Sequence, residues 1–185
     1  MPTSYVDEIV IRYLMKEGYL VSQGIWFQLP KEKTGKKVSS WSDIDIFAIK
    51  PGKPPLIIQC KSFSGTTKSE EFVKKVLFWF ESAENFLKNS DYKKWAPDGN
   101  YRKVFVVDVS VKKTEEKLKK KGIEVWNYKD ILDKLLKKLK EEQKDLKRKG
   151  EGIIGMEEDV LLRIFSDMIR RGLIKEEKLE NSSNN

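Results

Sequence analysis

The sequence predicts an α/β fold in which a mixed β-sheet is flanked by helices. Segments whose apolar residues recur at helical spacing alternate along the chain with short runs rich in Val, Ile and Phe. Glycines follow several of the predicted helices, as is common at helix C-termini. With 185 residues, of which 39% are hydrophobic, the chain has enough apolar side chains for one core.

The first half of the chain predicts a helix, three strands and a second helix. Residues 5–17 have helical spacing, and Gly18 ends that helix. The predicted strands, of which the last two read as buried, span residues 19–29, 41–49 and 56–61. The segment 50–55 joins two of them through a turn, because it contains a glycine and three prolines. A helix capped by Ser69 then runs to about Leu87.

The second half predicts two further strands, each followed by a helix, and a last helix. These elements are a buried strand within 102–111, a short lysine-rich helix from Thr114 to Gly122, a strand at 123–126, a long amphipathic helix at 128–148 and a helix at 157–171. We therefore expect a nuclease-like catalytic domain at 1–149 and a C-terminal helical extension at 150–175. The tail 176–185, rich in Glu, Asn and Ser, is expected to be disordered.

The charge of the chain favours a phosphate-bearing partner. The net charge is +8, and residues 112–149 hold 15 Lys and Arg against 8 Asp and Glu. The alternative interpretation of this excess is a solvated lysine-rich helix face. Abundant Lys and Glu with no His are typical of a thermophile protein.

Several classes of protein are disfavoured by the composition. One cysteine and no histidine disfavour a disulfide framework, a zinc centre and a Ser-His triad. The sequence has no phosphate-binding Gly-x-x-x-x-Gly-Lys loop, which argues against a nucleotide cofactor. We see neither a signal peptide nor an apolar run of membrane-spanning length, so a cytoplasmic protein without a membrane partner is expected.

Polar residues interrupt two neighbouring strands and predict a site. Side chains alternate between the two faces of a strand, so Asp43 and Asp45 share one face of the first strand. Gln59 and Lys61 share one face of the second strand, and in a hairpin these two faces can coincide. Cys60 would then point to the opposite face, as a small core residue rather than a nucleophile. Charges beside an apolar sheet are costly and imply a function.

This arrangement resembles the restriction-endonuclease-like superfamily, the PD-(D/E)xK nucleases. Asp45 stands where the superfamily has its first acid, and Gln59-Cys60-Lys61 stands where it has acid-x-Lys. The run Asp45-Ile46-Phe47-Ala48 followed by Ile58-Gln59-Cys60-Lys61 is most similar to the Mrr branch. The resemblance covers roughly residues 3 to 130 and implies the fold of that superfamily.

A second resemblance concerns the first helix. Archaeal Holliday-junction resolvases have an acid on this helix and a Gly-aromatic pair eleven residues later, which corresponds to Asp7 and Gly18-Tyr19. Glu8 is the neighbour that could serve instead. An acid that only complements the helix dipole is the alternative for both positions.

The resemblance implies a metal-dependent DNA endonuclease of repair, recombination or restriction. Mg²⁺ or Mn²⁺ would be held by Asp45 and by the Gln59 side-chain oxygen or the Cys60 carbonyl. Lys61 would orient or deprotonate the attacking water, or stabilise the transition state, and Asp7 or Glu8 would assist.

The partner expected from the resemblance is DNA. In the basic loop 31–37, Lys33, Lys36 and Lys37 are expected to contact phosphates. A homodimer is expected because cutting both strands of a duplex takes two sites.

Two other functions stay open. Gln59 replaces an acid and removes a negative charge, so the chain is alternatively an inactive nucleic-acid-binding module. It is alternatively an interaction subunit that uses its two C-terminal helices, although Leu135, Leu139 and Leu146 are interpreted as core. Core or core-rim positions, rather than base-stacking ones, are expected for Trp41, Trp79, Trp95 and Trp126.

Overall fold

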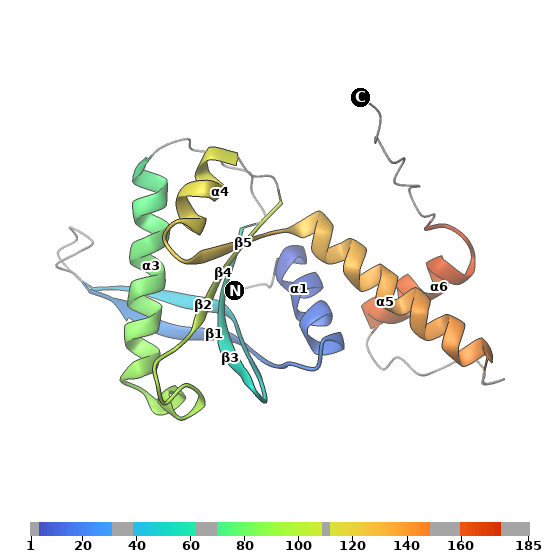
Figure 1. The fold of residues 1–185 in the computed structure, drawn as a ribbon, viewed down its shortest axis with the longest axis horizontal. Coiled ribbons are helices and arrows are strands. Elements are labelled where there is room, and N and C mark those ends of the chain that lie inside the picture. The colour runs from blue at the N-terminus through green and yellow to red at the C-terminus, as the bar shows by residue number, and fades with distance from the viewer. Residues whose placement is uncertain (1–3, 31–38, 62–69, 109–111, 149–159, 175–185) are drawn as a thin grey trace. The chain divides into compact units, whose positions relative to one another are not determined.

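The computed structural model describes residues 4–30, 39–61, 70–108, 112–148 and 160–174. Its elements follow the predicted order of a helix, three strands, a helix, a strand, a helix, a strand and helices (Figure 1). They are α1 (Tyr5–Lys16), β1 (Leu20–Leu29), β2 (Ser40–Lys50), β3 (Lys53–Lys61), α3 (Glu70–Lys88), the 3₁₀ helix η1 (Asp91–Trp95), β4 (Arg102–Val107), α4 (Lys112–Lys119), β5 (Ile123–Asn127), α5 (Tyr128–Arg148) and α6 (Val160–Arg170).

The five strands form one mixed sheet in the order β1-β2-β3-β4-β5. β1, β2 and β3 pair in antiparallel fashion, whereas β3, β4 and β5 are parallel. β2 and β3 are joined by the short turn at Gly52, as an antiparallel pair allows, and each parallel pair is joined through a helix. The predicted α/β class with a mixed sheet flanked by helices is confirmed.

The main core lies between the sheet and the helices α3 and α4. Its largest members include Phe27 of β1, Phe80 of α3 and Phe105 of β4, each at most 1% exposed. Leu118 places α4 on this side of the sheet. The indole N–H of Trp79 donates to the Ser42 hydroxyl at 2.9 Å and fixes α3 to β2.

The opposite side of the sheet is covered by α1. The buried residues outside the α3-side cluster include Val6, Val10 and Leu14 of this helix and the alternate strand residues Ile58 and Val104. Helix α1 contacts β1, β2 and β3, and Figure 1 shows α1 and α3 on opposite sides of the strands. The sheet is therefore buried on both faces, as its apolar central strands require.

Two of the observed elements differ clearly from the predicted ones. β3 begins at Lys53 and includes Pro54 and Pro55, because only Pro51 and Gly52 form the turn. The short helix η1 was not predicted from the sequence. Ser69, the expected helix cap, lies outside the described residues.

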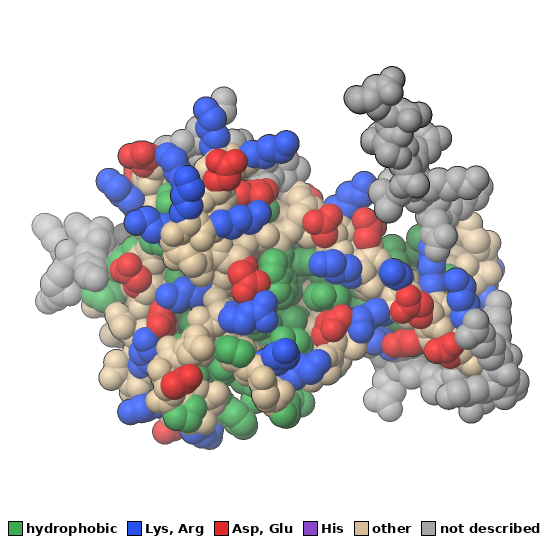
Figure 2. Space-filling view, in the orientation of Figure 1, with side chains coloured by type: hydrophobic (Ala, Val, Ile, Leu, Met, Phe, Trp, Pro, Cys, Tyr) green, Lys and Arg blue, Asp and Glu red, His purple; other side chains and the backbone are tan. Residues whose placement is uncertain are grey.

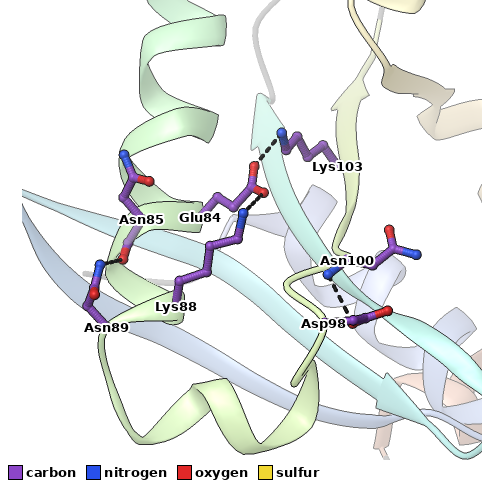
Figure 3. A network of polar contacts seen from close by, with 7 residues as sticks. All are labelled: Glu84, Asn85, Lys88, Asn89, Asp98, Asn100 and Lys103. Atoms are coloured by element: carbon purple, nitrogen blue, oxygen red, sulfur yellow. Dashed lines mark hydrogen bonds and ion pairs between the residues drawn. The ribbon is translucent and has the colours of Figure 1, made fainter.

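A network of paired charges ties α3 to β4 (Figure 3). Glu84 of α3 accepts from Lys88 of the same helix, at 2.6 Å, and pairs with Lys103 of β4. Although burial alone would raise the pKa of Glu84, the two lysines lower it below its ordinary value. This carboxylate is therefore a structural ion-pair partner.

The chain divides into two compact units, residues 1–133 and 134–185. The sequence-based boundary lies at residue 149, so the second part of α5 belongs to the second unit. There Leu135, Leu139 and Leu162 are buried, and the Gln143 amide donates to the Ser166 carbonyl at 2.8 Å. The core interpretation of Leu135 and Leu139 is confirmed, whereas the Leu146 side chain and the segments 150–159 and 175–185 lie outside the description.

Within the described ranges, no helix has both the length and the hydropathy needed to cross a membrane. Lysine and arginine side chains lie over α4 and along α5, with acidic side chains between them (Figure 2).

Candidate metal and catalytic site

Asp45 lies where β2 and β3 stop pairing. In the described part of these strands, one pair of backbone positions, Lys50–Lys53, flanks the turn, and further pairs run from Ala48–Leu56 to Ile46–Ile58. At the next position the Asp45 carboxylate accepts a hydrogen bond from the Cys60 backbone N–H, with Oδ2 and N 2.6 Å apart. The side chain thus replaces a main-chain acceptor and is held at the fork between the strands.

An irregularity at Gly24 of β1 accompanies this position. Gln23 pairs with Ile46 and Ile25 pairs with Ile44, so Gly24 stands across from Asp45. Its φ of +60° is in the left-handed region, which disrupts the regular pleat. Ile44 and Phe47 both belong to the α3-side core although they are three residues apart. Regular alternation along β2 therefore fails around Asp45.

Asp7 brings a second carboxylate to the same place from the first turn of α1. Ser4 and Asp7 form a reciprocal capping box, in which each side chain accepts from the backbone N–H of the other. Ligand atoms of Asp7, Asp45 and Cys60 all lie within 4.8 Å of one another. We call these three residues the Asp7–Asp45–Cys60 cluster.

The structure distinguishes between the two candidate helix acids. Glu8 forms an ion pair with Arg12, one turn further along α1. Asp7, rather than Glu8, is the residue whose carboxylate approaches Asp45. The same side chain that caps the helix therefore also reaches the cluster, so the capping role and the site role are not alternatives.

The two strand faces do not coincide as predicted. Cys60 is buried, at 7% exposure, and lies on the opposite face of β3 from Gln59, as expected. Its sulfur, however, lies beside Asp7 and Asp45, so Asp45 does not share the face of Gln59. The physical reason is the broken alternation of β2 around Asp45, across from Gly24. Burial, followed by the charges of both acids, raises the pKa of the thiol well above its ordinary value, so it is no thiolate nucleophile.

Gln59 and Lys61 are placed by the regular pleat of β3. Ile57 belongs to the α3-side core, so alternation puts Gln59, which is 8% exposed, on that face. Lys61, the last residue of β3, is exposed, and its charge acts on Asp45. By the same alternation Lys61 starts from the face of Gln59, and what links it to the cluster is the effect of its charge on Asp45. The ligand role of Gln59 stays a prediction.

The cluster perturbs the ionisation of its central acid. Burial raises the pKa of Asp45 to about 6, even though the hydrogen bond from Cys60 opposes the change. The charges of Asp7 and Asp43 contribute to this rise, and that of Lys61 opposes it. A buried carboxylate beside another carboxylate is costly in the absence of a cation.

The donor set fits a divalent cation. Two ligands on one Mg²⁺ lie roughly 3 to 4 Å apart, given metal–oxygen distances near 2.1 Å. The three ligand atoms, within 4.8 Å of one another, come close to that spacing. Carboxylate oxygens suit Mg²⁺ and Mn²⁺, and a thiol among them favours Mn²⁺ over Mg²⁺.

The other predicted positions divide into three groups. Lys33, Lys36 and Lys37 lie outside the described residues. Trp79, 8% exposed, is in the α3-side core, and Trp126 is half-buried against the Tyr13 ring, so their prediction is confirmed. The core prediction is wrong for Trp41 and Trp95, which are 63% and 48% exposed. The face of β2 that carries Trp41 and the short helix η1 that carries Trp95 are uncovered at these positions.

Two features of the site were missed in the sequence. A lone glycine within a strand pattern, here Gly24, is a known signal of a local break in the pleat. That Asp45 and Gln59 face opposite sides of the sheet has no such signal, because it depends on how the two neighbouring strands separate.

We compared the chain with known proteins, and no family model, curated protein or solved structure matches it.

Proposed function

We propose that this protein is a metal-dependent DNA endonuclease with a restriction-endonuclease-like fold. The observation that supports it best is the convergence of Asp7, Asp45 and Cys60 within 4.8 Å, beside the charge of Lys61. Acids from a helix and a strand, followed by a lysine on the next strand, match the pattern on which the sequence resemblance rests. The order of helix, three antiparallel strands, helix and parallel strand is consistent with that fold.

In this proposal, Asp45 and Asp7 hold Mg²⁺ or Mn²⁺. A bound divalent cation lowers the pKa of water and neutralises charge that develops on the phosphate. Asp45 is fixed by the Cys60 N–H and Asp7 by the Ser4 capping box, so neither carboxylate needs to reorganise on binding. The Cys60 thiol, or its carbonyl, is the third donor.

Lys61 is the second functional group of the proposal. The residue is exposed and its charge acts on Asp45, so a phosphate held at the cluster would feel the positive charge of its ammonium. In this position it stabilises negative charge on the phosphate oxygens and orients the attacking water. Gln59 lies on the face of β3 toward α3, opposite the cluster.

The substrate proposed is DNA, because the net charge of +8 favours a polyanion and the chemistry is phosphodiester hydrolysis. Repair, recombination and restriction are the processes in which such an endonuclease acts. Two copies of the chain would place two sites on a duplex, and light scattering of the purified protein tests this homodimer.

One observation favours a second candidate, a nucleic-acid-binding module without catalysis. Gln59 replaces the usual acid and, by alternation, points toward α3, which leaves the site with fewer negative ligands. The fold and the basic surface would then be retained for binding alone.

A cleavage assay separates the two candidates. Labelled single-stranded, duplex, flapped and four-way DNA are incubated with Mg²⁺ or Mn²⁺ at moderate and elevated temperature. We expect metal-dependent cutting that Lys61→Ala loses, while Lys53→Ala, at the other end of β3, retains it. Binding of all four DNAs without any cutting by the wild type would instead support the binding module.

A further inference from the structure

Two tryptophans are exposed on one face of the β1–β2 ribbon. Trp26 is 48% and Trp41 is 63% exposed. Their neighbours Ile25, Phe27 and Ile44 belong to the α3-side core. Side chains alternate between the faces of a strand, so both indoles lie on the face that α3 does not cover.

The backbone register places the two indoles next to each other. Trp26 stands directly opposite Asp43, and Trp41 lies two residues from Asp43 on the same strand. The two tryptophans are therefore diagonal neighbours, about 7 to 8 Å apart at their backbones, which is within reach of aromatic side chains.

The same face leads to the Asp7–Asp45–Cys60 cluster. Asp45 lies two residues beyond Asp43, so Trp26 stands between Trp41 and Asp45. Trp41 and Asp45 are four positions apart along the strand, or about 13 Å. That length corresponds to roughly four stacked nucleotides at 3.4 Å each.

The character of the surface fits a nucleic acid more closely than an apolar partner. A single exposed tryptophan is ordinary, but two adjacent indoles on a strand that leads to a carboxylate cluster are not. In the sequence, the ten-residue connection between β1 and β2 holds four lysines and one glutamate. Aromatic rings beside positive charge are the usual means of binding single strands, since every base has a flat face.

We propose that Trp26 and Trp41 form a stacking surface for unpaired bases of DNA next to the bond that is cut. This inference rests on the proposed nuclease function and names its substrate class, which is DNA with a single-stranded segment beside the scissile phosphate. The bases about two and four nucleotides from that phosphate stack on Trp26 and Trp41.

Binding of a fluorescein-labelled single-stranded oligonucleotide, measured by anisotropy in EDTA, tests the inference without any cleavage. Alanine at Trp26 or Trp41 should weaken binding by roughly 5- to 100-fold, the usual effect of losing one stacked base. Trp95→Ala is the matched control, because this indole is equally exposed, at 48%, but lies on η1. It should bind as the wild type does.

Two further comparisons separate stacking from other causes. Trp41→Tyr should retain most of the affinity and Trp41→Leu should not, because only the former keeps an aromatic face. The salt dependence of binding should be the same in the wild type and all tryptophan variants, since no phosphate contact is removed.

The inference is overturned if both alanine variants bind the oligonucleotide as tightly as the wild type does. Equal losses in Trp41→Ala and Trp95→Ala, or equal affinities of Trp41→Tyr and Trp41→Leu, would also overturn it. A wild type that binds single strands through these indoles but cuts no DNA would contradict the nuclease function and leave the stacking surface standing.

Discussion

Two carboxylates of the first unit, Glu84 and Asp45, are partly buried and yet ionise differently. Glu84 has an ammonium group on each side, from Lys88 and Lys103, and its pKa is lowered despite its burial. Asp45 has another carboxylate, that of Asp7, within 4.8 Å, and burial raises its pKa to about 6. The first arrangement is balanced by lysines of the chain, whereas the second places two carboxylates together, which the proposed metal ion would stabilise.

The difference teaches how to separate a structural charge from a functional one. Removing Glu84 should lower stability and leave chemistry unchanged. Removing the charge of Asp45 should abolish chemistry and raise the stability of the metal-free protein, because folding then no longer desolvates an ion beside a like charge.

The largest expected effect is on cleavage. Asp45→Asn should lower the rate of metal-dependent DNA cutting by about 10³-fold, the usual order for loss of a preorganised charged group. Asp43→Asn, on the same strand but outside the cluster, is the control and should keep most of the activity. Single-turnover cleavage of the preferred DNA measures both, and an Asp45→Asn variant that cuts at the wild-type rate would rule out this site.

The second effect is on stability without metal. The folded pKa of Asp45 is raised from 3.8 to about 6, so its favourable contribution is complete below pH 4 and is lost as the pH rises through 6. In EDTA at pH 7.5, Asp45→Asn should therefore raise the free energy of unfolding by about 2 kcal/mol. Denaturant unfolding at pH 4 should show no such gain, and a variant less stable than the wild type at pH 7.5 would contradict the account.

The third effect concerns the paired charge. Glu84→Gln should lower the free energy of unfolding by about 1.5 kcal/mol at pH 7, because two lysines lose their partner. The folded pKa of Glu84 is lowered, so this stabilisation is present above the unfolded value of 4.5 and is lost as the pH falls through the folded pKa.

Glu71→Gln is the control for Glu84, because Glu71 pairs with Lys75 on the same helix but is 74% exposed. Its effect on unfolding at pH 7 should be smaller. An equal loss in both variants would mean that burial of the Glu84 pair adds nothing.

The smallest effect tests how the backbone positions Asp45. Gly24 and Gly52 have φ values of +60° and +73°, and an added Cβ would meet nothing within 4 Å at either. Alanine should therefore destabilise both by about 1 kcal/mol through backbone strain alone. Only Gly24→Ala, opposite Asp45, should also slow cleavage. Equal cleavage by the two variants would show that the irregularity in β1 does not position the acid.

The sequence predicted the order of elements and the neighbourhood of Asp45 because both depend on local patterns. Apolar periodicity identified α1 and the strands, and the short turn at Gly52 placed Asp45 near Cys60 and Lys61. That Asp45 and Gln59 face opposite sides of the sheet could not be predicted in this way, since it depends on a break in the pleat beside Gly24 of a third strand.

The exposure of the tryptophans was missed for a similar reason. Trp41 and Trp79 have the same apolar side chain. Trp41 lies on the face of β2 that α3 does not cover, whereas Trp79 is part of α3 and packs in its core. Which face of a strand is covered is decided by the packing of helices that are distant in the sequence. Periodicity within one strand holds no information on that packing.

Mn²⁺ binding, followed by electron paramagnetic resonance of the free ion, tests the central claim most directly. The Glu8 carboxylate pairs with Arg12 and is not part of the cluster, so Glu8→Gln should bind the ion as the wild type does. Asp7→Asn and Asp45→Asn should each weaken binding by roughly tenfold or more. If Asp45→Asn binds Mn²⁺ as tightly as the wild type does, the Asp7–Asp45–Cys60 cluster is not the metal site, and the proposed nuclease mechanism is wrong.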